Sequence, residues 1–163
     1  MARMTIKSGE EYSLRLSKLA KCTDGIARKA LYLGAKVVTD QIRKNIEALP
    51  EEKLRYLVKG DKFEGIPREQ KQDVLNGLGV TKMESDGDGH NVKIGFDGYG
   101  SMPTKTYPKG VPNQVIMRAL ESGTSWVRQK HPVVRTAVNA TKAKAVETMN
   151  QSINEDCERI IKK

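Results

Sequence analysis

The sequence predicts an α+β fold: a small antiparallel sheet with a hairpin, packed against two long helices and shorter helices. Apolar residues recur at helical spacing in the N-terminal and C-terminal thirds of the chain. Between them, Val92, Ile94 and Phe96 alternate with other residues after two Asp-Gly pairs, which is typical of a hairpin. A chain of 163 residues is about one domain, 1–163. Its expected parts are N-terminal helices at 9–48, a hairpin, loop and short helix at 67–123, and a C-terminal helix at 132–162.

The N-terminal part predicts two helices in succession. The segment 21–23 looks like a break, after which Thr23 or Asp24 can cap a second helix that ends before Pro50. Gly34 is costly inside a helix, so we expect another element to come close there. The apolar stripe of this second helix is Ile26, Ala30, Leu33, Val37, Ile42 and Ile46.

A short helical turn and a loop are expected over 50–66, followed by a helix that starts at Pro67 and ends at Gly77 or Gly79. The hairpin then pairs 80–83 with 91–96.

The hairpin loop covers 85–90, where the Asp-Gly pairs favour the positive φ angles of a turn. A long irregular loop follows at 101–111, because its two prolines oppose both helix and strand. We expect Lys105, Tyr107 and Lys109 to be exposed on it.

The last two helices have clear boundaries. One starts at Pro112-Asn113 and ends at Gly123, where we expect a left-handed helix terminus. A basic loop with Trp126 leads to His131-Pro132, and Pro132 opens the long C-terminal helix. The predicted stripe of that helix is Val134, Val138, Thr141, Ala145, Met149, Ile153, Cys157 and Ile160.

Catalytic and metal-binding patterns are weak throughout. Asp86, Asp88 and Asp97 resemble a calcium loop, but Asn91 stands where that loop needs glycine, so a hairpin turn is favoured. The glycines of 95–100 are in the reverse order of the dinucleotide fingerprint, which favours turns.

His90 and His131 belong to no recognisable triad. Glu121 with the hydroxyls after it is best interpreted as a helix end with capping groups. We therefore expect no enzyme activity, no cofactor and no metal.

The net charge of +9 has three readings: a nucleic-acid footprint, a docking surface for an acidic partner, or a solvated surface. Cys22 and Cys157 lack metal-ligand spacing and are expected to be reduced thiols of an intracellular chain. The N-terminus lacks a secretory pattern, and no apolar run is long enough for a membrane span, so a soluble protein is expected.

Nucleic-acid binding is favoured by a basic cluster around Trp126. It comprises Arg128, Lys130 and Arg135, with Lys142 and Lys144 on the next helix. Acidic residues are mixed through the helices, and no helix-turn-helix, zinc finger or stacking platform is visible. Any DNA contact is therefore expected to be incidental and non-specific.

Four segments together resemble a known family. They are 92–99, 110–113, the Glu-Ser-Gly-Thr-Ser of 121–125, and Lys130-His131-Pro132 with Arg135 and Ala137. In this order they resemble the tail-component (neck) proteins of long-tailed bacteriophages, the gene-product-ten-like family. The resemblance covers about 45 residues, and the flanking helices fit its layout. This chain departs from the family at Val133 and Thr136, where an aromatic residue and a proline are common.

The resemblance implies a virion structural protein, made in the host cytoplasm, that completes the tail and joins it to the head. It implies other neck and tail proteins as partners and a homo-oligomeric ring, commonly six-fold. Independently of the resemblance, a basic face is physically suited to line a channel through which DNA passes. The alternative is a small basic DNA-binding protein of a mobile element. The residues expected to carry assembly are Gly95, Asp97, Gly98, Tyr99, Pro112, Asn113, Glu121, Gly123, Thr124, Ser125, Lys130, Pro132 and Arg135.

Overall fold

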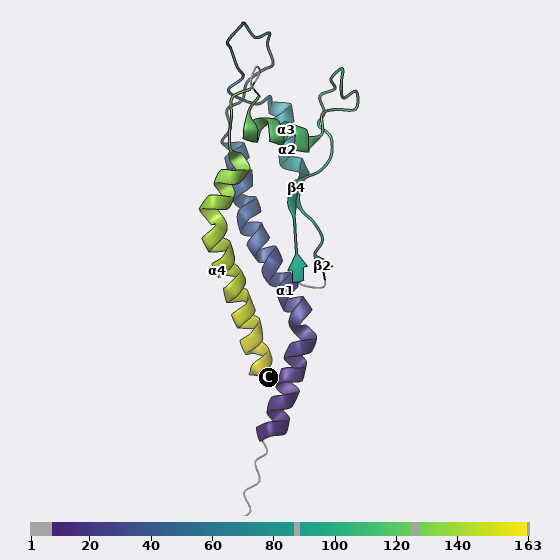
Figure 1. The fold of residues 1–163 in the computed structure, drawn as a ribbon, viewed down its shortest axis with the longest axis vertical. Helices are drawn as coiled ribbons and strands as arrows, with labels where there is room; N and C mark the ends of the chain where they lie inside the picture. Colours follow the sequence, from purple (N-terminus) through teal and green to yellow (C-terminus); the bar gives the residue numbers. More distant parts are fainter. Residues whose placement is uncertain (1–7, 87–88, 125–127, 163) are drawn as a thin grey trace, which may run out of the picture.

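The computed structural model describes residues 8–86, 89–124 and 128–162, and it confirms the α+β class. Two long helices, α1 (Ser8–Glu47) and α4 (Val133–Ile161), run antiparallel and give the molecule its length (Figure 1). Two short helices, α2 (Arg68–Gly77) and α3 (Asn113–Ser122), lie together at one end. The strands are β1 (Leu78–Val80), β2 (Glu84–Asp86), β3 (Gly89–Asn91) and β4 (Ile94–Phe96).

The expected break near residue 22 is wrong, because α1 continues through it for 40 residues, about 60 Å. The side chains chosen as caps are engaged elsewhere. The Thr23 hydroxyl donates a hydrogen bond to the Leu19 carbonyl one turn earlier, at 3.1 Å. The Asp24 carboxylate lies 3.3 Å from the Nε2 atom of His90 on the hairpin. Neither group is therefore left to start a new helix.

Small residues let α4 approach α1 closely. A Cβ atom built on Gly34 would lie 2.7 Å from the Cγ atom of Met149, so the expected close approach at this glycine is confirmed. Nearby, the Lys29 ammonium lies 2.9 Å from the carboxylate of Asp156. Ala30 is also buried, and the absent side chain at Gly34 leaves room for Met149 between the two helices.

The predicted stripe of α4 is partly wrong. Val138 and Ile153 are 40% and 36% exposed, although both were expected in the core. The buried residues of α4 are Val133, Ala137, Thr141, Ala145, Ser152 and Asp156. One position along a helix rotates a side chain by about 100°. Because α1 comes close, the buried line passes through small and polar residues and leaves larger apolar ones outside.

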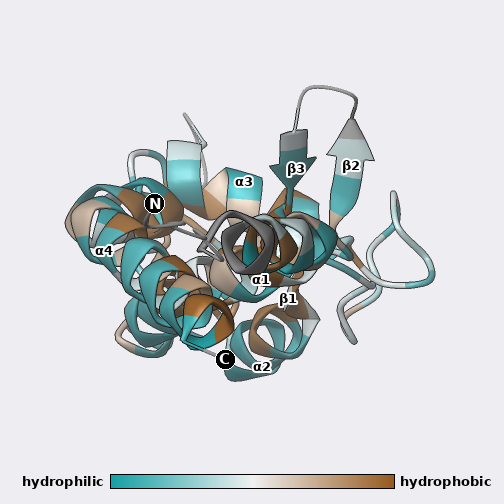
Figure 2. Ribbon diagram, turned by 90° about the horizontal axis from the view of Figure 1, so that it is seen from below, coloured by the Kyte–Doolittle hydropathy of each residue, from teal (hydrophilic) through white to brown (hydrophobic). Residues whose placement is uncertain are grey.

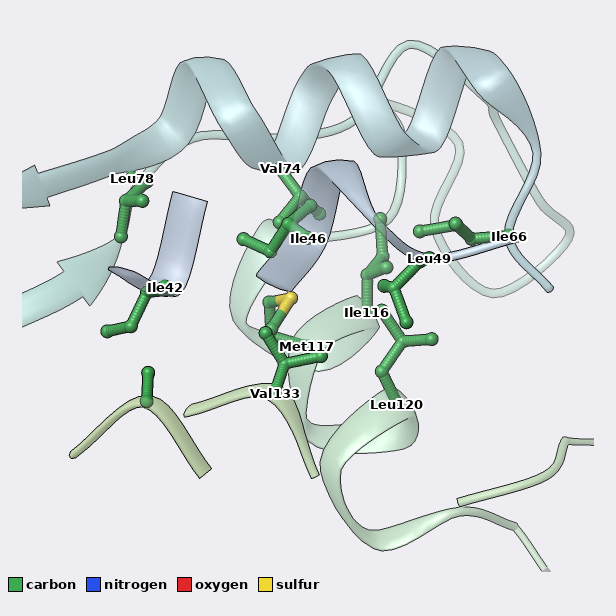
Figure 3. Packing of buried hydrophobic residues seen from close by; sticks show 11 residues of the cluster. Ile42, Ile46, Leu49, Ile66, Val74, Leu78, Ile116, Met117, Leu120 and Val133 are labelled. Carbon is green, nitrogen blue, oxygen red and sulfur yellow. The ribbon is translucent and has the colours of Figure 1, made fainter. Parts of the chain in front are cut away.

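The hydrophobic core lies at the end of the molecule where α2, α3 and the ends of the long helices meet (Figure 3). Its fully buried large side chains are Ile42, Ile46, Ile66, Val74 and Leu120. The core therefore supports the α3–α4 corner. Farther from this core, α1 and α4 are held together by contacts between their own side chains.

The segment 50–66 contains no helical turn, so that expectation is wrong. The Glu52 carboxylate accepts hydrogen bonds from the backbone N–H groups of Glu64 and Gly65, at 2.8 and 3.1 Å. The Glu52 N–H donates to the Ile66 carbonyl at 3.2 Å, and the Ile66 N–H to the Pro50 carbonyl at 3.0 Å. These bonds close the segment into a compact loop.

The hairpin is confirmed, but its bounds differ from the prediction: residues 81–83 of the expected first strand lie outside the ladder, which is divided in two. β1 pairs with β4, and β2 pairs with β3, both antiparallel. Between the two ladders the Tyr32 hydroxyl, from α1, donates to the Thr81 carbonyl and accepts from the Met83 N–H. The strands also continue into the predicted 85–90 loop, where Ser85 pairs with His90. The remaining turn, 87–88, lies outside the described residues.

The other boundaries agree with the sequence. α2 begins after Pro67 and ends at Gly77, and α3 ends before Gly123. α4 begins directly after Pro132, which the sequence placed in its first turn and the structure places at the N-cap.

Candidate functional site

The first group of predicted residues surrounds Asn113 at the start of α3. Its side-chain Nδ2 atom donates to the Asp97 carbonyl at 2.7 Å and to the Asp73 carbonyl at 3.1 Å. Its backbone N–H donates to the Gly98 carbonyl at 3.1 Å. The side chain is 3% exposed, so these bonds are shielded from water. Asn113 thereby ties α3 to α2 and to the end of β4.

Two glycines with positive φ lie in this neighbourhood. Gly98 has φ +81°. The Asp97 carboxylate accepts the Gly98 N–H at 2.7 Å and so stabilises the turn at this glycine. Gly110 has φ +101°, and a Cβ atom there would collide with the Gly100 carbonyl oxygen. Nothing in the structure explains Gly95, since a Cβ atom built there meets open space.

The base of the long loop is fixed by residues that the sequence analysis did not select. The Asp73 carboxylate accepts the backbone N–H of Ser101 at 2.7 Å and its hydroxyl at 2.8 Å. Beyond this base Lys105 and Lys109 are exposed as expected, whereas Tyr107 is half-buried. Asp73 lies inside the short helix α2, and no sequence pattern predicts that its side chain fixes the long loop.

Tyr99 and Pro112 meet at the same place. They form an isolated antiparallel bridge between the end of the hairpin and the start of α3. The Tyr99 side chain is 67% exposed, so its backbone closes the turn and its ring is displayed at the surface.

The second group forms the corner between α3 and α4, where Glu121 acts as a cap. One carboxylate oxygen accepts the Val134 N–H at 2.9 Å, and the other accepts the Arg135 N–H at 3.0 Å. The N-cap residue Pro132 makes no side-chain capping bond. Glu121 therefore satisfies two free N–H groups of α4 from the last turn of α3. The sequence indicated capping here but assigned it to the hydroxyl residues.

The Thr124 hydroxyl oxygen accepts the Arg128 N–H at 2.9 Å within the loop after α3, so it satisfies a backbone group as predicted but caps neither helix. Gly123 ends α3 with φ +70° and ψ 172°. The predicted left-handed helical terminus is thus wrong in ψ, although the positive φ is present. The chain must extend at once to bring the His131 N–H within 2.7 Å of the Leu120 carbonyl. Ser125 lies outside the described residues.

The basic cluster is less exposed than the sequence suggested. Lys130 and Arg135 are exposed, as is the neighbouring Pro132, but Arg128 is half-buried. Burial lowers the pKa of the Arg128 guanidinium, and the charge of Glu52 opposes this effect. Arg128 also forms an isolated bridge with Phe63. The corner is therefore packed against the 52–64 loop.

Exposed apolar side chains gather at two places that the sequence analysis did not identify. Leu54, Tyr56 and Val58 in the 52–64 loop are 52%, 102% and 73% exposed. Val146 on α4 is 46% exposed, near Ile153. The signal in this loop is an alternation of charged and apolar residues, a pattern that also fits a short helical turn.

Among the described residues, no group of three or more His, Cys, Asp or Glu side chains is arranged to hold a metal ion. Cys22 and Cys157 are free thiols. No helix in residues 8–86, 89–124 and 128–162 is long and apolar enough to cross a membrane. No protein-family model, curated protein or solved structure matches this chain.

Proposed function

We propose that this chain is a virion structural protein of the neck or tail end of a long-tailed bacteriophage. In this role it completes the tail, joins it to the DNA-filled head, and has no enzymatic activity. It assembles in the host cytoplasm with other neck and tail proteins, as a homo-oligomeric ring that is commonly six-fold in the family it resembles.

The observation that carries the proposal is that some residues of the family-like segments fix the backbone, whereas others are exposed at the surface. Asn113, Glu121 and Thr124 bind backbone groups of neighbouring segments and so fix the shape of the molecule. Lys130 and Arg135, at the same corner, have exposed side chains. A fixed framework that displays charged side chains at its surface is suited to docking against other proteins.

The distribution of apolar surface also supports an assembly role. A ring subunit needs two different contact surfaces, one for each neighbour. The exposed residues of the 52–64 loop and those on α4 lie on different parts of an elongated molecule (Figure 1).

The test is deletion of the gene from the phage that carries it. Electron micrographs of the lysate are expected to show filled heads and separate tails, and a plasmid copy of the gene should restore joined particles. Joined, infectious virions in the absence of the gene would refute the proposal.

Non-specific DNA contact is a second candidate, favoured by the exposed side chains of Lys105, Lys109 and Lys130. Phosphate contacts are strongest at low ionic strength, so binding to duplex DNA is expected at about 50 mM salt and should weaken steeply as salt rises. Absence of binding at about 50 mM salt would reject it.

A further inference from the structure

One side of α1 carries an unbroken line of residues that is mostly basic. Residues three or four positions apart lie on the same side of a helix, and eight residues from 18 to 43 follow this spacing. They are Lys18, Lys21, Gly25, Arg28, Tyr32, Lys36, Thr39 and Arg43. We call these eight residues the basic row. It contains no acidic residue and no large aliphatic residue, and it is about 38 Å long.

The basic row lies on the side of α1 that is turned away from α4. Gly34, which lies against Met149, and Asn45, whose amide donates to the Val133 carbonyl at 3.0 Å, mark the side that α4 covers. At about 100° per residue, both lie roughly half a turn from the middle of the row. Viewed along the helices, α4 and the β2–β3 hairpin lie on different sides of α1 (Figure 2). All five lysine and arginine side chains of the row are exposed.

The hairpin adds a sixth cation to this surface. Tyr32, in the middle of the row, donates its hydroxyl hydrogen to the Thr81 carbonyl at 3.3 Å and accepts the Met83 N–H at 3.0 Å. These bonds hold the hairpin alongside α1 (Figure 1). Lys82 lies between the two bonded residues, and its side chain is exposed. The basic surface is therefore built from two elements.

Acidic side chains beside the row and at the hairpin are largely engaged with other groups. The Asp24 carboxylate lies 3.3 Å from the Nε2 atom of His90, and the Glu84 carboxylate lies 2.7 Å from the Lys93 ammonium. In contrast, none of the five basic side chains of the row makes an ion pair within residues 8–86, 89–124 and 128–162. Their charges are thus available to a ligand.

The two ends of the row differ in their surroundings. Near Arg43 the flanking exposed residues are mixed in charge, because Asp40, Lys44 and Glu47 follow one another on this part of α1. From Lys18 to Lys36 the only acidic residue of α1 is the engaged Asp24. The positive charge is therefore concentrated over this longer part of the row.

The chemistry of the row fits phosphates better than an acidic protein. The exposed large apolar side chains of α1 are Leu14 and Leu16, which both precede the row. Protein interfaces have an apolar core, whereas surfaces that bind nucleic acid are more polar and more positive. Gly25 adds no bulk to the row, and a Cβ atom built there meets nothing within 4 Å, so packing does not require this glycine. A backbone can approach closely at such a position.

We infer that the basic row, together with Lys82, binds the phosphate backbone of duplex DNA. Contacts to phosphates carry no sequence information, so the binding is non-specific. The inference rests on the DNA contact given above as the second candidate function, and it assigns that contact to α1 and the hairpin.

Fluorescence anisotropy of the full chain with a labelled duplex of about 20 base pairs tests the inference, since such a duplex is longer than the row at about 3.4 Å per base pair. Wild-type protein is expected to bind at about 50 mM salt, with a slope of about −3 to −5 for log K against log salt. Two duplexes of unrelated sequence should bind equally well.

Paired substitutions then locate the contact. Lys21→Gln with Lys36→Gln removes two charges from the row and keeps a good helix former at both positions. This double variant should bind about tenfold more weakly or worse at about 50 mM salt, with a slope shallower by about 2. Lys53→Gln with Lys59→Gln is the matched control, because both lysines are exposed on the 52–64 loop. Its affinity should stay within about twofold of wild type.

Lys82→Gln gives a second measurement that leaves α1 unchanged, and it should make the slope shallower by about 1. Thermal unfolding checks that each variant is folded.

Three results would overturn the inference. Absence of wild-type binding at about 50 mM salt rejects the DNA contact as a whole and favours an acidic protein partner. Equal losses in the row variant and the matched control show that only net charge matters. Loss of binding in Lys105→Gln with Lys109→Gln, with none in the row variant, moves the contact to the long loop. The gene deletion described above reports on head–tail joining whether or not DNA is bound, so the two proposals fail separately.

Discussion

Replacing Glu121 by alanine tests the corner that joins α3 to α4. The carboxylate accepts two backbone N–H groups, at 2.9 and 3.0 Å, in the first turn of α4. The alanine side chain accepts neither, and Pro132 at the N-cap offers no replacement. The change also removes a negative charge from the positive end of the helix dipole.

The expected loss in the free energy of unfolding follows from these contacts. Removal of a capping side chain costs about 0.5–2 kcal/mol, and a hydrogen bond to a charged acceptor contributes about 1.5–3 kcal/mol. Glu121 is half-buried, so water replaces part of the lost bonding. We expect a net loss of about 2–3 kcal/mol, or a fall in Tm of about 5–10 °C for a chain of this size.

Thermal and urea unfolding, followed by circular dichroism, measure this loss. Glu121→Gln keeps one acceptor oxygen and should lose roughly half as much stability. Glu155→Ala, an exposed glutamate on α4, is the control and should change stability by less than about 0.5 kcal/mol. If Glu121→Ala were no less stable than Glu155→Ala, the corner would not depend on this carboxylate.

Five further substitutions test other parts of the account. Gly123→Val should cost about 1–3 kcal/mol in urea unfolding, since φ +70° with ψ 172° is open essentially to glycine alone; wild-type stability would contradict that backbone assignment. Gly77→Ala should lose about 1–3 kcal/mol, because the added methyl would lie 2.5 Å from the Asn113 amide nitrogen; an unchanged midpoint would contradict that packing. Lys105→Ala and Lys109→Ala should leave stability within about 0.5 kcal/mol, and loss of soluble protein would show that their loop is structural. For Glu52, burial raises the pKa, but hydrogen bonds from Glu64 and Gly65 and the Arg55 charge outweigh it and hold the pKa below its ordinary value of 4.5. The carboxyl of Glu52 therefore binds a proton more readily in the unfolded chain than in the folded one. The wild-type chain should have a higher Tm than Glu52→Gln above pH 4.5, and this difference should disappear as the pH falls below 4.5. A Tm difference that does not change with pH would contradict the assignment.

The sequence predicted the elements whose signals are local. Pro67, Pro112 and Pro132 each stand immediately before a helix, and Gly123 follows the end of one. Proline restricts the backbone of its own residue and glycine gives its own residue access to positive φ, so both effects are local and do not depend on distant contacts. The hairpin was predicted for the same reason, from alternation and turn residues.

The errors arose where distant contacts decide the outcome. Thr23 looks like a cap in sequence, yet its hydroxyl bonds within a continuous helix. Helical spacing placed Val138 and Ile153 of α4 in the core, whereas the line that α1 covers includes Ala137, Ala145 and Ser152, and the absent side chain of Gly34 leaves room for Met149. Glu52 closes its loop by accepting N–H groups twelve and thirteen residues away. No periodicity encodes such a contact.

The candidate site was found in part. The sequence selected Asn113, Glu121 and Gly123, which do hold the turns of the structure. It missed Asp73, which fixes the long loop, and the exposed side chains of Leu54, Tyr56 and Val58, because both depend on how segments are arranged in space. Turn-forming residues are visible in a sequence, whereas a surface assembled from separate segments is not.

Reconstitution of head–tail joining in vitro tests the central claim most directly. Filled heads and separate tails from a phage that lacks this gene would be mixed with the purified chain, and joined particles and plaque titre would be counted. The account predicts that wild-type protein restores both. Heads and tails that stay separate with wild-type protein, or that join equally well without it, would contradict the account.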